Sequence, residues 1–494
     1  MTVTRSIGIA ILLFWLAMNG LLIKRQTVAP APLLTLRGSE KITEGSEEWW
    51  GIYYRGEKIG YANQSIALKT KGYKLNDYSR LNLNLLGTIQ PAETRLEMEA
   101  NDDWILERFD FALNSKEIGF KARGAVKDNK LSLEIDSAGH RSNREITLTQ
   151  APYLLASLKP YVVTQQLETG KKFYFSTFDP STLSQQVTTI VIEGREQIRI
   201  GNRLEPAIKM RQSFGGISVL SWVDVHGRTL KEESPAGMSM IRQDQEEAKN
   251  LPSHSVPLDM IAQAAIPLAR PIADAKALPA IELKLAGVNL ANFALDGGRQ
   301  KLTGDRLEIT REDISKLAAT AIPVKEPRLQ AFLQPTAFMQ SDHPRIKSLA
   351  ARIVGGERDA MKAAVKIKNW VFGELAKEPT VSIPNALEVL QAKKGDCNEH
   401  TVLFNALARA AGIPAKTVVG VVYLRGAFYY HAWSEVWLGG WVALDSVFNQ
   451  LPADVTHVKF LEGEIDRQID ILQLIGNLRI EVSDQLPVAS GTKN

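Results

Sequence analysis

Short runs in which apolar and polar residues alternate dominate the chain between residues 41 and 250. Turn-forming glycine, asparagine and aspartate residues separate the runs, which is typical of half-buried strands joined by tight connections. The pattern predicts strands at 49–55, 58–68, 73–85, 94–100, 104–113, 119–126 and 131–135. Such a meander would close as a large curved antiparallel sheet or half-barrel, with a helical interruption near 151–158.

A helical periodicity appears in the last third of the chain. Apolar residues recur every three or four positions between 397 and 411, and Gly412-Ile413-Pro414 supplies a stop. Asp396 is placed to act as an N-cap, and Glu399 three residues later completes a capping box. The pattern predicts a helix over 397–411 with Cys397 in its first turn.

Three runs of β-branched and aromatic residues follow this helix, at 417–423, 428–438 and 441–445. Glycines separate them, so we expect adjacent antiparallel strands. His431 lies on the second strand and Asp445 at the end of the third. One helix start and two neighbouring strands therefore supply a cysteine, a histidine and an aspartate in that order.

Cys397 is the only cysteine among the 494 residues. The start of a helix carries a partial positive charge and free N–H groups, which favour a thiolate over a thiol. We therefore predict an acidified thiol at Cys397. A thiol, an imidazole base and a carboxylate that orients the base are the parts of a cysteine acyl-transfer site, so the catalytic candidates are Cys397, His431 and Asp445.

The connection between the last two strands decides whether this site can form. A strict two-residue loop at Gly439-Gly440 would pair Asp445 with Ser434, on the sheet face opposite His431. A three-residue turn with a bulge would instead set Asp445 opposite Trp433, diagonal to His431 on the same face. We therefore predict a bulge or a longer loop at this turn.

The segments that carry a family resemblance are Gly395-Asp396-Cys397, Gly412-Ile413-Pro414-Ala415, His431-Ala432-Trp433-Ser434-Glu435-Val436 and Gly440-Trp441-Val442-Ala443-Leu444-Asp445. In this order they resemble the core of the transglutaminase-like superfamily. The resemblance implies a papain-like core with Cys397 as nucleophile, His431 as general base and Asp445 as the orienting carboxylate. The chain has Asp445-Ser446-Val447 where the family often has Asp-Pro-Thr, which we interpret as variation in a local turn.

These parts would perform acyl transfer on a glutaminyl side chain or a peptide bond, through an acyl-enzyme and with release of ammonia or an amine. The N–H of Cys397 is a natural oxyanion donor, whereas the sequence assigns no second donor. An amine acceptor would give a crosslink, and water would give deamidation or proteolysis. The alternative is a non-catalytic envelope scaffold or binding protein that uses a transglutaminase-like fold.

We interpret the other polar and aromatic residues near the site as structural. We expect His400 to be a solvated helix residue and the tryptophans 433, 437 and 441 to pack the sheet. Asp454 and His457 resemble a segment often found after the core in this superfamily, and we interpret them as structural.

Residues 7–23 are nearly all apolar, with Arg5 before them and Lys24 and Arg25 after them. The stretch exceeds the roughly 7–15 residues typical of a signal-peptide core, and no convincing cleavage site follows. We therefore predict an uncleaved signal anchor at 1–26, with a cleaved signal as the alternative. The expected localisation is a single-pass inner (plasma) membrane protein with an extracytoplasmic (periplasmic) catalytic domain. Lys24 and Arg25 favour a cytoplasmic body under the positive-inside rule, but a large domain is exported largely regardless of flanking charge.

The fold class expected from these patterns is α+β: an N-terminal membrane helix, a large antiparallel β domain and a C-terminal papain-like core. The predicted divisions are 1–26 (anchor), 27–40 (linker), 41–250 (β domain), 251–278 (Pro-rich linker), 279–340 (β-rich extension), 341–465 (catalytic core) and 466–494 (extension and tail).

The composition limits the kinds of partner and cofactor that we expect. The net charge is +4 and the pI about 8.8, without a basic stripe, so we expect no nucleic-acid partner. The seven histidines form no metal-spaced pair, and no phosphate-binding glycine loop occurs, so no cofactor or metal is expected. The expected partners are a protein or peptide substrate, with the cell envelope as one source, and the membrane through the N-terminal helix.

Overall fold

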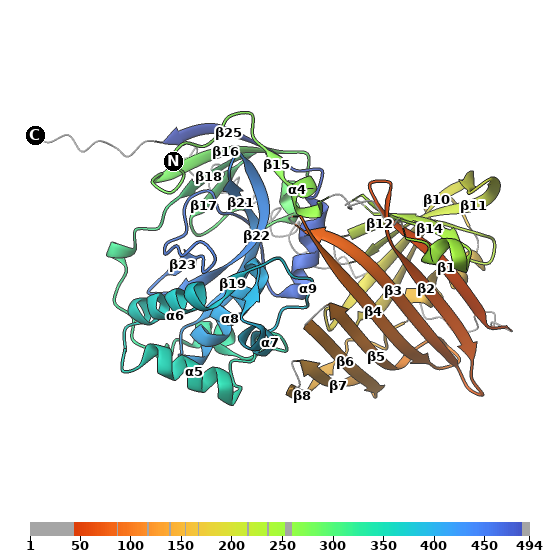
Figure 1. Cartoon of the computed structure of the whole chain (residues 1–494), viewed down its shortest axis with the longest axis horizontal. Helices are drawn as coiled ribbons and strands as arrows, with labels where there is room; N and C mark the ends of the chain where they lie inside the picture. Colours follow the sequence, from red (N-terminus) through yellow and green to blue (C-terminus); the bar gives the residue numbers. More distant parts are fainter. Residues whose placement is uncertain are drawn as a thin grey trace, which may run out of the picture.

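The computed structural model describes residues 44–486, with gaps at 86, 116–117, 138–139, 154, 166, 215–216, 235–236 and 252–258. A large curved sheet forms one part of the molecule, and a mixed region of helices and smaller sheets forms the other (Figure 1). Strands account for 48% of the described residues and helices for 20%. The predicted α+β class is therefore wrong. The structure is mostly β, because strands dominate it. The predicted division into segments remains a prediction.

The predicted membrane helix also requires correction. No helix among the described residues is long and apolar enough to cross a membrane. Residues 7–23, where the anchor was predicted, lie outside the described part of the chain. The N-terminal membrane helix and the single-pass inner-membrane localisation are therefore not supported.

The large sheet contains fourteen strands in two meanders. The first consists of β1 (Ser46–Tyr54), β2 (Glu57–Leu68), β3 (Tyr73–Leu85), β4 (Thr88–Ala100), β5 (Leu106–Ser115), β6 (Ile118–Lys127), β7 (Lys130–Ser137) and β8 (His140–Thr147). The second consists of β9 (Lys172–Asp179), β10 (Ser184–Ile200), β11 (Arg203–Phe214), β12 (Ile217–Val223), β13 (Thr229–Glu233) and β14 (Met238–Gln243). The chain runs outward from β1 to β8, crosses to β9 at the opposite edge, and returns to β14, which pairs with β1. The predicted antiparallel meander is confirmed.

The sheet folds over a shared core. Buried side chains from the first meander, such as Leu75 and Phe120, belong to the same apolar cluster as Phe175 and Met210 from the second. Alternate strand residues point inward, which is why a period-two pattern buries one face. Helix α2 (Leu155–Val163) lies in the connection between β8 and β9, near the predicted interruption, and adds Leu158 to the core.

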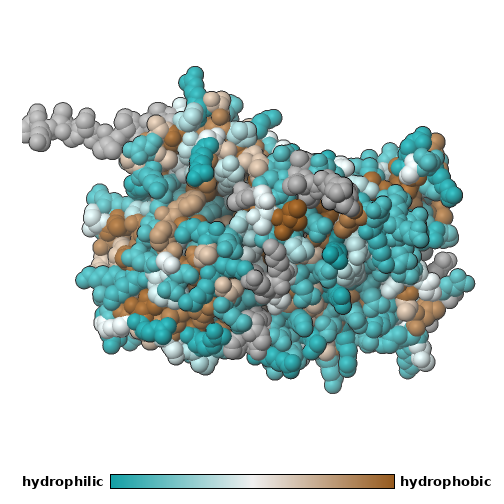
Figure 2. Space-filling model, viewed as in Figure 1, coloured by the Kyte–Doolittle hydropathy of each residue, from teal (hydrophilic) through white to brown (hydrophobic). Residues whose placement is uncertain are grey.

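Polar residues occupy the outward strand positions. Cross-strand ion pairs such as Arg123–Asp110 and Lys130–Glu145 lie there with half-exposed side chains, so each contributes little to stability. The face drawn in Figure 2 is mainly hydrophilic, with smaller hydrophobic areas between the polar ones. Inward apolar and outward polar positions together account for the period of the sequence pattern.

The second part of the molecule begins after two short helices, α3 (Gln245–Lys249) and α4 (Met260–Ala264). One sheet has the order β15 (Ile266–Pro267), β22 (Ala427–Trp437), β21 (Ala415–Leu424) and β24 (Val458–Glu462), with β23 (Trp441–Leu444) also paired to β22. A second sheet has the order β17 (Gln300–Thr303), β18 (Arg306–Thr310), β16 (Ala280–Ala286) and β25 (Arg479–Leu486). Two short strands, β19 (Ala376–Lys377) and β20 (Lys394–Gly395), pair in parallel.

Helices cover one side of the first of these sheets. They are α5 (Pro344–Val354), α6 (Ala360–Glu374), α7 (Ala386–Ala392) and α8 (Cys397–Ala410), with α9 (Ile465–Gln468) after the sheet. Short 3-10 turns occur at Leu290–Asn292, Ile314–Lys316, Pro327–Leu333 and Ile469–Gln473. Every residue of α8 from Glu399 to Arg409 is buried, so this helix is enclosed between the sheet and its neighbouring helices.

Direct contacts join the two parts. Phe338 belongs to the core of the large sheet, and Arg144 of β8 donates a hydrogen bond to the Thr336 carbonyl at 2.7 Å. The backbone N–H of Gly119 on β6 donates to Glu388 of α7 at 3.1 Å. The large sheet is therefore packed against the helical region that carries α8.

Candidate active site

Helix α8 begins at the residue that the sequence predicts. The Asp396 carboxylate accepts a hydrogen bond from the Asn398 N–H at 3.0 Å, and Glu399 accepts one from the Asp396 N–H at 2.9 Å. This is the predicted capping box, and the observed helix confirms the predicted 397–411 within one residue. Because Cys397 is the first helical residue, its own N–H belongs to the groups that a helix start leaves without an intrahelical acceptor.

Cys397 is half-buried where α8 packs on β22. Its sulfur accepts a hydrogen bond from the backbone N–H of Ala432, the residue that follows His431. One turn further along α8, the Thr401 hydroxyl donates to the Ala432 carbonyl at 3.1 Å. The start of the helix is therefore held against the strand that carries His431.

The predicted acidity of Cys397 is wrong for the resting site. Burial raises the pKa of the thiol well above its ordinary value, and the neighbouring carboxylates of Asp396 and Glu399 raise it further. The Ala432 N–H lowers the pKa but does not compensate for these effects. Because desolvation exceeds the influence of the helix start, the thiol is protonated at rest and needs a base.

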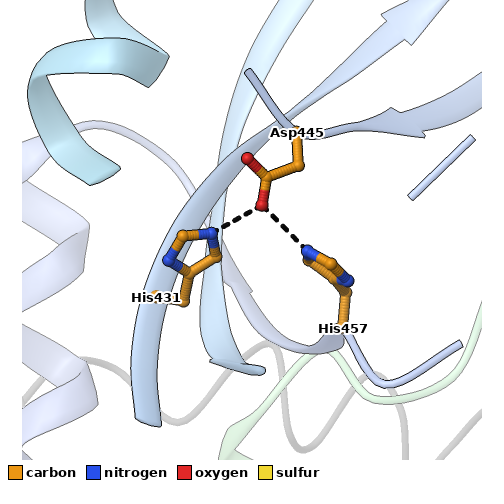
Figure 3. Close-up of side chains that lie close together, drawn as sticks. All are labelled: His431, Asp445 and His457. Carbon is orange, nitrogen blue, oxygen red and sulfur yellow. Dashed lines mark hydrogen bonds and ion pairs between the residues drawn. The ribbon is translucent and has the colours of Figure 1, made fainter. Parts of the chain in front are cut away.

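The pairing of β22 with β23 brings His431 and Asp445 together. Trp437 lies opposite Trp441 and Ser434 lies opposite Leu444, so residues 438–440 form the connection. The predicted longer loop is confirmed, and the register continues with Asp445 opposite Trp433, on the His431 side of the sheet. His431 Nε2 lies 2.7 Å from Asp445 Oδ2 (Figure 3).

The Asp445 carboxylate is fully buried and fully hydrogen-bonded. Its Oδ1 accepts from the backbone N–H groups of Val447 at 2.6 Å and Phe448 at 2.9 Å. Burial alone would raise the pKa of Asp445, but the imidazoles of His431 and His457 hold it well below its ordinary range. The carboxylate is therefore a fixed anion beside His431.

His457 is the residue whose importance the sequence analysis missed. Its Nε2 lies 2.9 Å from Asp445 Oδ2, the same oxygen that meets His431. Its Nδ1 lies 3.2 Å from Asp454 Oδ1. Burial lowers the pKa of His457, but hydrogen bonds to Asp445 and Asp454 outweigh burial and raise it. An acid and a histidine three residues apart, just after the site aspartate, are the signal that could have suggested this role.

Aromatic rings fix the plane of the His431 side chain. The Phe448 ring is stacked on it with centroids 5.1 Å apart and an interplanar angle of 8°. Trp433 lies nearly parallel at 6.1 Å. The His431 ring is thus held by stacking as well as by the hydrogen bond to Asp445.

His400 differs from its expected position. It was predicted to be solvated, but its side chain is fully buried, because α8 is enclosed on all sides. Its Nδ1 lies 2.7 Å from the Asp396 carbonyl oxygen, and burial lowers its pKa. Among the tryptophans, Trp433 is buried in the sheet as expected, and the Trp437 and Trp441 rings meet edge to face at 5.7 Å.

Three described residues could in principle hold a metal ion. One ligand atom from each of His431, Asp445 and His457 lies within 4.8 Å of the others. Two imidazoles and a carboxylate suit zinc chemically. The separations of 2.7 Å and 2.9 Å between the ring nitrogens and Oδ2 are hydrogen-bond lengths, however, and both rings are already used as donors to one oxygen. The geometry therefore fits a hydrogen-bonded chain.

The structure pairs His431 with Asp445 directly and adds His457 and Asp454 to this pair. In the described part of the chain, Cys397 is linked to the pair through the Ala432 backbone and not by a hydrogen bond to the His431 ring. Cys397 and His431 therefore lie where the start of α8 meets strand β22, and Asp445, directly after β23, is hydrogen-bonded to His431.

Residues 347–446 match the family described as the transglutaminase-like superfamily. A curated relative, an uncharacterized protein of Haemophilus influenzae, is 27% identical over 182 residues. That alignment covers 30% of this chain and 47% of the relative. The chain thus spans about half the length of the curated relative that it matches.

Several solved structures are similar to parts of the chain. A candidate cysteine protease from Cytophaga hutchinsonii is 17% identical with a TM-score of 0.28, covering 41% of this chain and 83% of its own. A β-barrel-like domain of unknown function from Brucella abortus is 10% identical with a TM-score of 0.32, covering 40% of this chain and 95% of its own. A candidate protease from Parabacteroides distasonis is 9% identical with a TM-score of 0.21, covering 71% of this chain and 68% of its own.

Proposed function

Because residues 347–446 belong to the transglutaminase-like superfamily, we propose that the chain is a cysteine-type enzyme that transfers or hydrolyses acyl groups of protein or peptide amides. Cys397 is the nucleophile, His431 the general base and Asp445 the carboxylate that orients the base. The family match supports cysteine-dependent chemistry in general. The type of bond attacked and the acceptor are the parts that we propose.

The bond from His431 Nε2 to Asp445 Oδ2 is the observation that carries this proposal. Since the carboxylate is an acceptor only, Nε2 must carry a hydrogen, and the neutral ring then has an unprotonated Nδ1. The Nδ1 side of the ring points away from Asp445 (Figure 3). A ring fixed in this tautomer, on the strand whose next N–H binds the Cys397 sulfur, is suited to receive the thiol proton.

The first half of the reaction forms a thioester. His431 Nδ1 takes the Sγ proton, and Sγ attacks the amide carbonyl carbon, whose oxygen becomes an oxyanion. The backbone N–H of Cys397 is one donor for this oxyanion, because it lies at the start of α8. The C–N bond then breaks, and the imidazolium returns its proton to the leaving nitrogen as ammonia or an amine leaves.

The second half releases the acyl group. Water or a primary amine attacks the thioester carbonyl, His431 takes the proton of that nucleophile, and the Cys397 sulfur leaves and regains a proton. Water gives a carboxylic acid, by deamidation or proteolysis, and an amine gives a new amide. Because the resting thiol is neutral, His431 must take its proton for the sulfur to act as a nucleophile.

A second candidate function is a non-catalytic scaffold that retains the fold. The observation that favours it is the half-buried, protonated Cys397, because a structural cysteine has the same environment. The two candidates differ in whether His431 affects the reactivity of the sulfur.

The test is alkylation of the full chain with iodoacetamide, followed by intact mass. Because the sequence has one cysteine, each adduct reports Cys397 alone. The wild type is compared with His431→Ala, with Cys397→Ala as the blank and with His226→Ala, an exposed histidine outside the site, as the matched control. A parallel assay follows incorporation of a fluorescent primary amine into casein, together with ammonia release.

We expect His431→Ala to react with iodoacetamide about 10²-fold more slowly than the wild type and the His226→Ala control. Amine incorporation would then identify a crosslinking enzyme, and ammonia release without incorporation a deamidase. Equal alkylation rates in the wild type and His431→Ala would overturn the proposal in favour of the scaffold.

A further inference from the structure

Four side chains form a continuous hydrogen-bonded chain behind the candidate base. His431 Nε2 meets Asp445 Oδ2 at 2.7 Å, the same oxygen meets His457 Nε2 at 2.9 Å, and His457 Nδ1 meets Asp454 Oδ1 at 3.2 Å (Figure 3 shows the first three residues). His457 lies between two carboxylates and is fully buried. The proposed function uses only the first two of these residues.

The acceptors around His457 determine its protonation. Both of its nitrogens face oxygen atoms that can only accept, since Asp445 and Asp454 are hydrogen-bonded by donors on every side. Asp454 accepts from Gln450 Nε2 at 2.8 Å and from the Thr456 N–H at 2.9 Å and hydroxyl at 2.5 Å. Both His457 nitrogens must then carry hydrogens, so the ring is an imidazolium.

A buried imidazolium costs desolvation energy unless it is paired, and a structural role alone does not require a charge at this position. Within the hydrogen-bonded chain, two carboxylates and one imidazolium leave a net charge of −1 while His431 is neutral. When His431 takes the thiol proton, the same four groups become neutral. Counting Cys397, the site keeps a net charge of −1 that moves from these four groups to the sulfur, and the two carboxylates stabilise the protonated His431 that accompanies the thiolate.

We propose that His457 is a positioning residue for the candidate reaction: as an imidazolium held by Asp454, it orients the Asp445 carboxylate and reduces its negative charge, so that Asp445 fixes the tautomer of His431. The effect of His457 on the reaction rests on the proposed function. The charge and tautomer of the two rings are properties of the folded protein and are measurable without any turnover.

The position of β24 explains why this histidine reaches Asp445. His457 immediately precedes β24, which pairs with β21, and β21 pairs with β22 so that Gly420 lies opposite His431. The Trp433 ring packs edge to face against the His457 ring, with centroids 5.3 Å apart. The buried His457 side chain is therefore packed against Trp433 while its Nε2 meets Asp445.

The experiment compares the wild type with His457→Gln, which keeps one donor but no charge, and with His457→Leu, which keeps neither. Asp454→Asn removes the second carboxylate while His457 remains, and exposed His226→Gln is the matched control. Nitrogen-15 NMR of the histidine rings reports the tautomer of His431 and the charge of His457. Alkylation of Cys397 by iodoacetamide across pH reports the consequence for the thiol.

In the wild type we expect one ring with two slowly exchanging N–H protons and one neutral ring protonated at Nε2. The two-proton signal should disappear in His457→Leu, and alkylation should slow about 10–100-fold, with partial recovery in His457→Gln. The pH dependence should change in both variants, which loss of packing alone would not cause. His226→Gln should behave as the wild type.

A wild-type rate and pH profile in folded His457→Leu, together with the loss of rate in His431→Ala, would overturn the inference and leave the proposed function intact. If His431→Ala reacts as fast as the wild type, the proposed function fails, and the NMR signals still decide the charge of His457. A neutral His457 ring, or stoichiometric zinc in the purified protein whose removal by a chelator changes the His431 signal, would also overturn the inference.

Discussion

Gly420 of β21 lies so close to Val458 of β24 that a Cβ on residue 420 would overlap the Val458 carbonyl oxygen. The contact involves backbone, so a side-chain rotation cannot relieve it. Gly420 also lies opposite His431 on β22 and next to Lys459 on β24. The absence of a side chain at Gly420 thus permits the close approach of β21, the neighbour of the strand that carries His431, to β24, which follows His457.

Gly420→Ala should therefore destabilise the protein by about 1–3 kcal/mol, because an overpacked core site forces the backbone apart. The matched control is Gly356→Ala, at a position where an added Cβ meets nothing within 4 Å. Urea unfolding of both variants measures the difference. Equal stabilities would show that β24 shifts freely.

Asp396→Asn should move the pH profile of Cys397 alkylation toward lower pH. The Asp396 carboxylate raises the pKa of the thiol, and asparagine removes the charge while it remains an effective N-cap. The rate is measured with iodoacetamide between pH 6 and about 10, the range around the ordinary thiol pKa. An unchanged profile in a folded variant would mean that Asp396 does not influence the acidity of the thiol, and that burial and the remaining carboxylates set it.

Asp445→Asn should lower the alkylation rate of Cys397 by about 10²-fold or more, because the amide cannot fix the His431 tautomer as an anion does. Asp110→Asn, on the exposed face of β5, is the control for loss of one carboxylate. Circular dichroism establishes that both variants fold. A rate close to that of the wild type would remove Asp445 from the candidate machinery.

His457 should make the stability of the protein depend on pH in a defined direction. Its pKa is raised in the folded state, so its contribution is complete below the unfolded value of about 6.5 and is lost as pH rises through the folded value. Asp445 and Asp454 have lowered pKa values, so their contribution is present above about 4 and is lost as pH falls.

The free energy of unfolding of the wild type should therefore exceed that of His457→Gln most clearly between about pH 4 and 6.5, and the difference should narrow toward pH 9. Denaturant titrations at four pH values measure this difference. A gap that widens with rising pH would contradict the charged state of His457.

Much of the local architecture follows from the sequence because its causes are local. The capping residues Asp396 and Glu399 define the start of α8, and alternation of side chains defines the strands of the large sheet. The register that sets Asp445 beside His431 could also be predicted, because a period of two excludes the two-residue connection at Gly439-Gly440.

Only the tertiary structure decided the electrostatics of the site. The acidity of Cys397 was predicted wrongly because the helix start is a local property, whereas burial and neighbouring carboxylates depend on packing. His457 reaches Asp445 through the pairing of β24 with β21, two strands separated by more than thirty residues in the chain. The sequence by itself determined which elements form and which residues begin them, and the long-range packing of those elements determined the charges that their side chains carry.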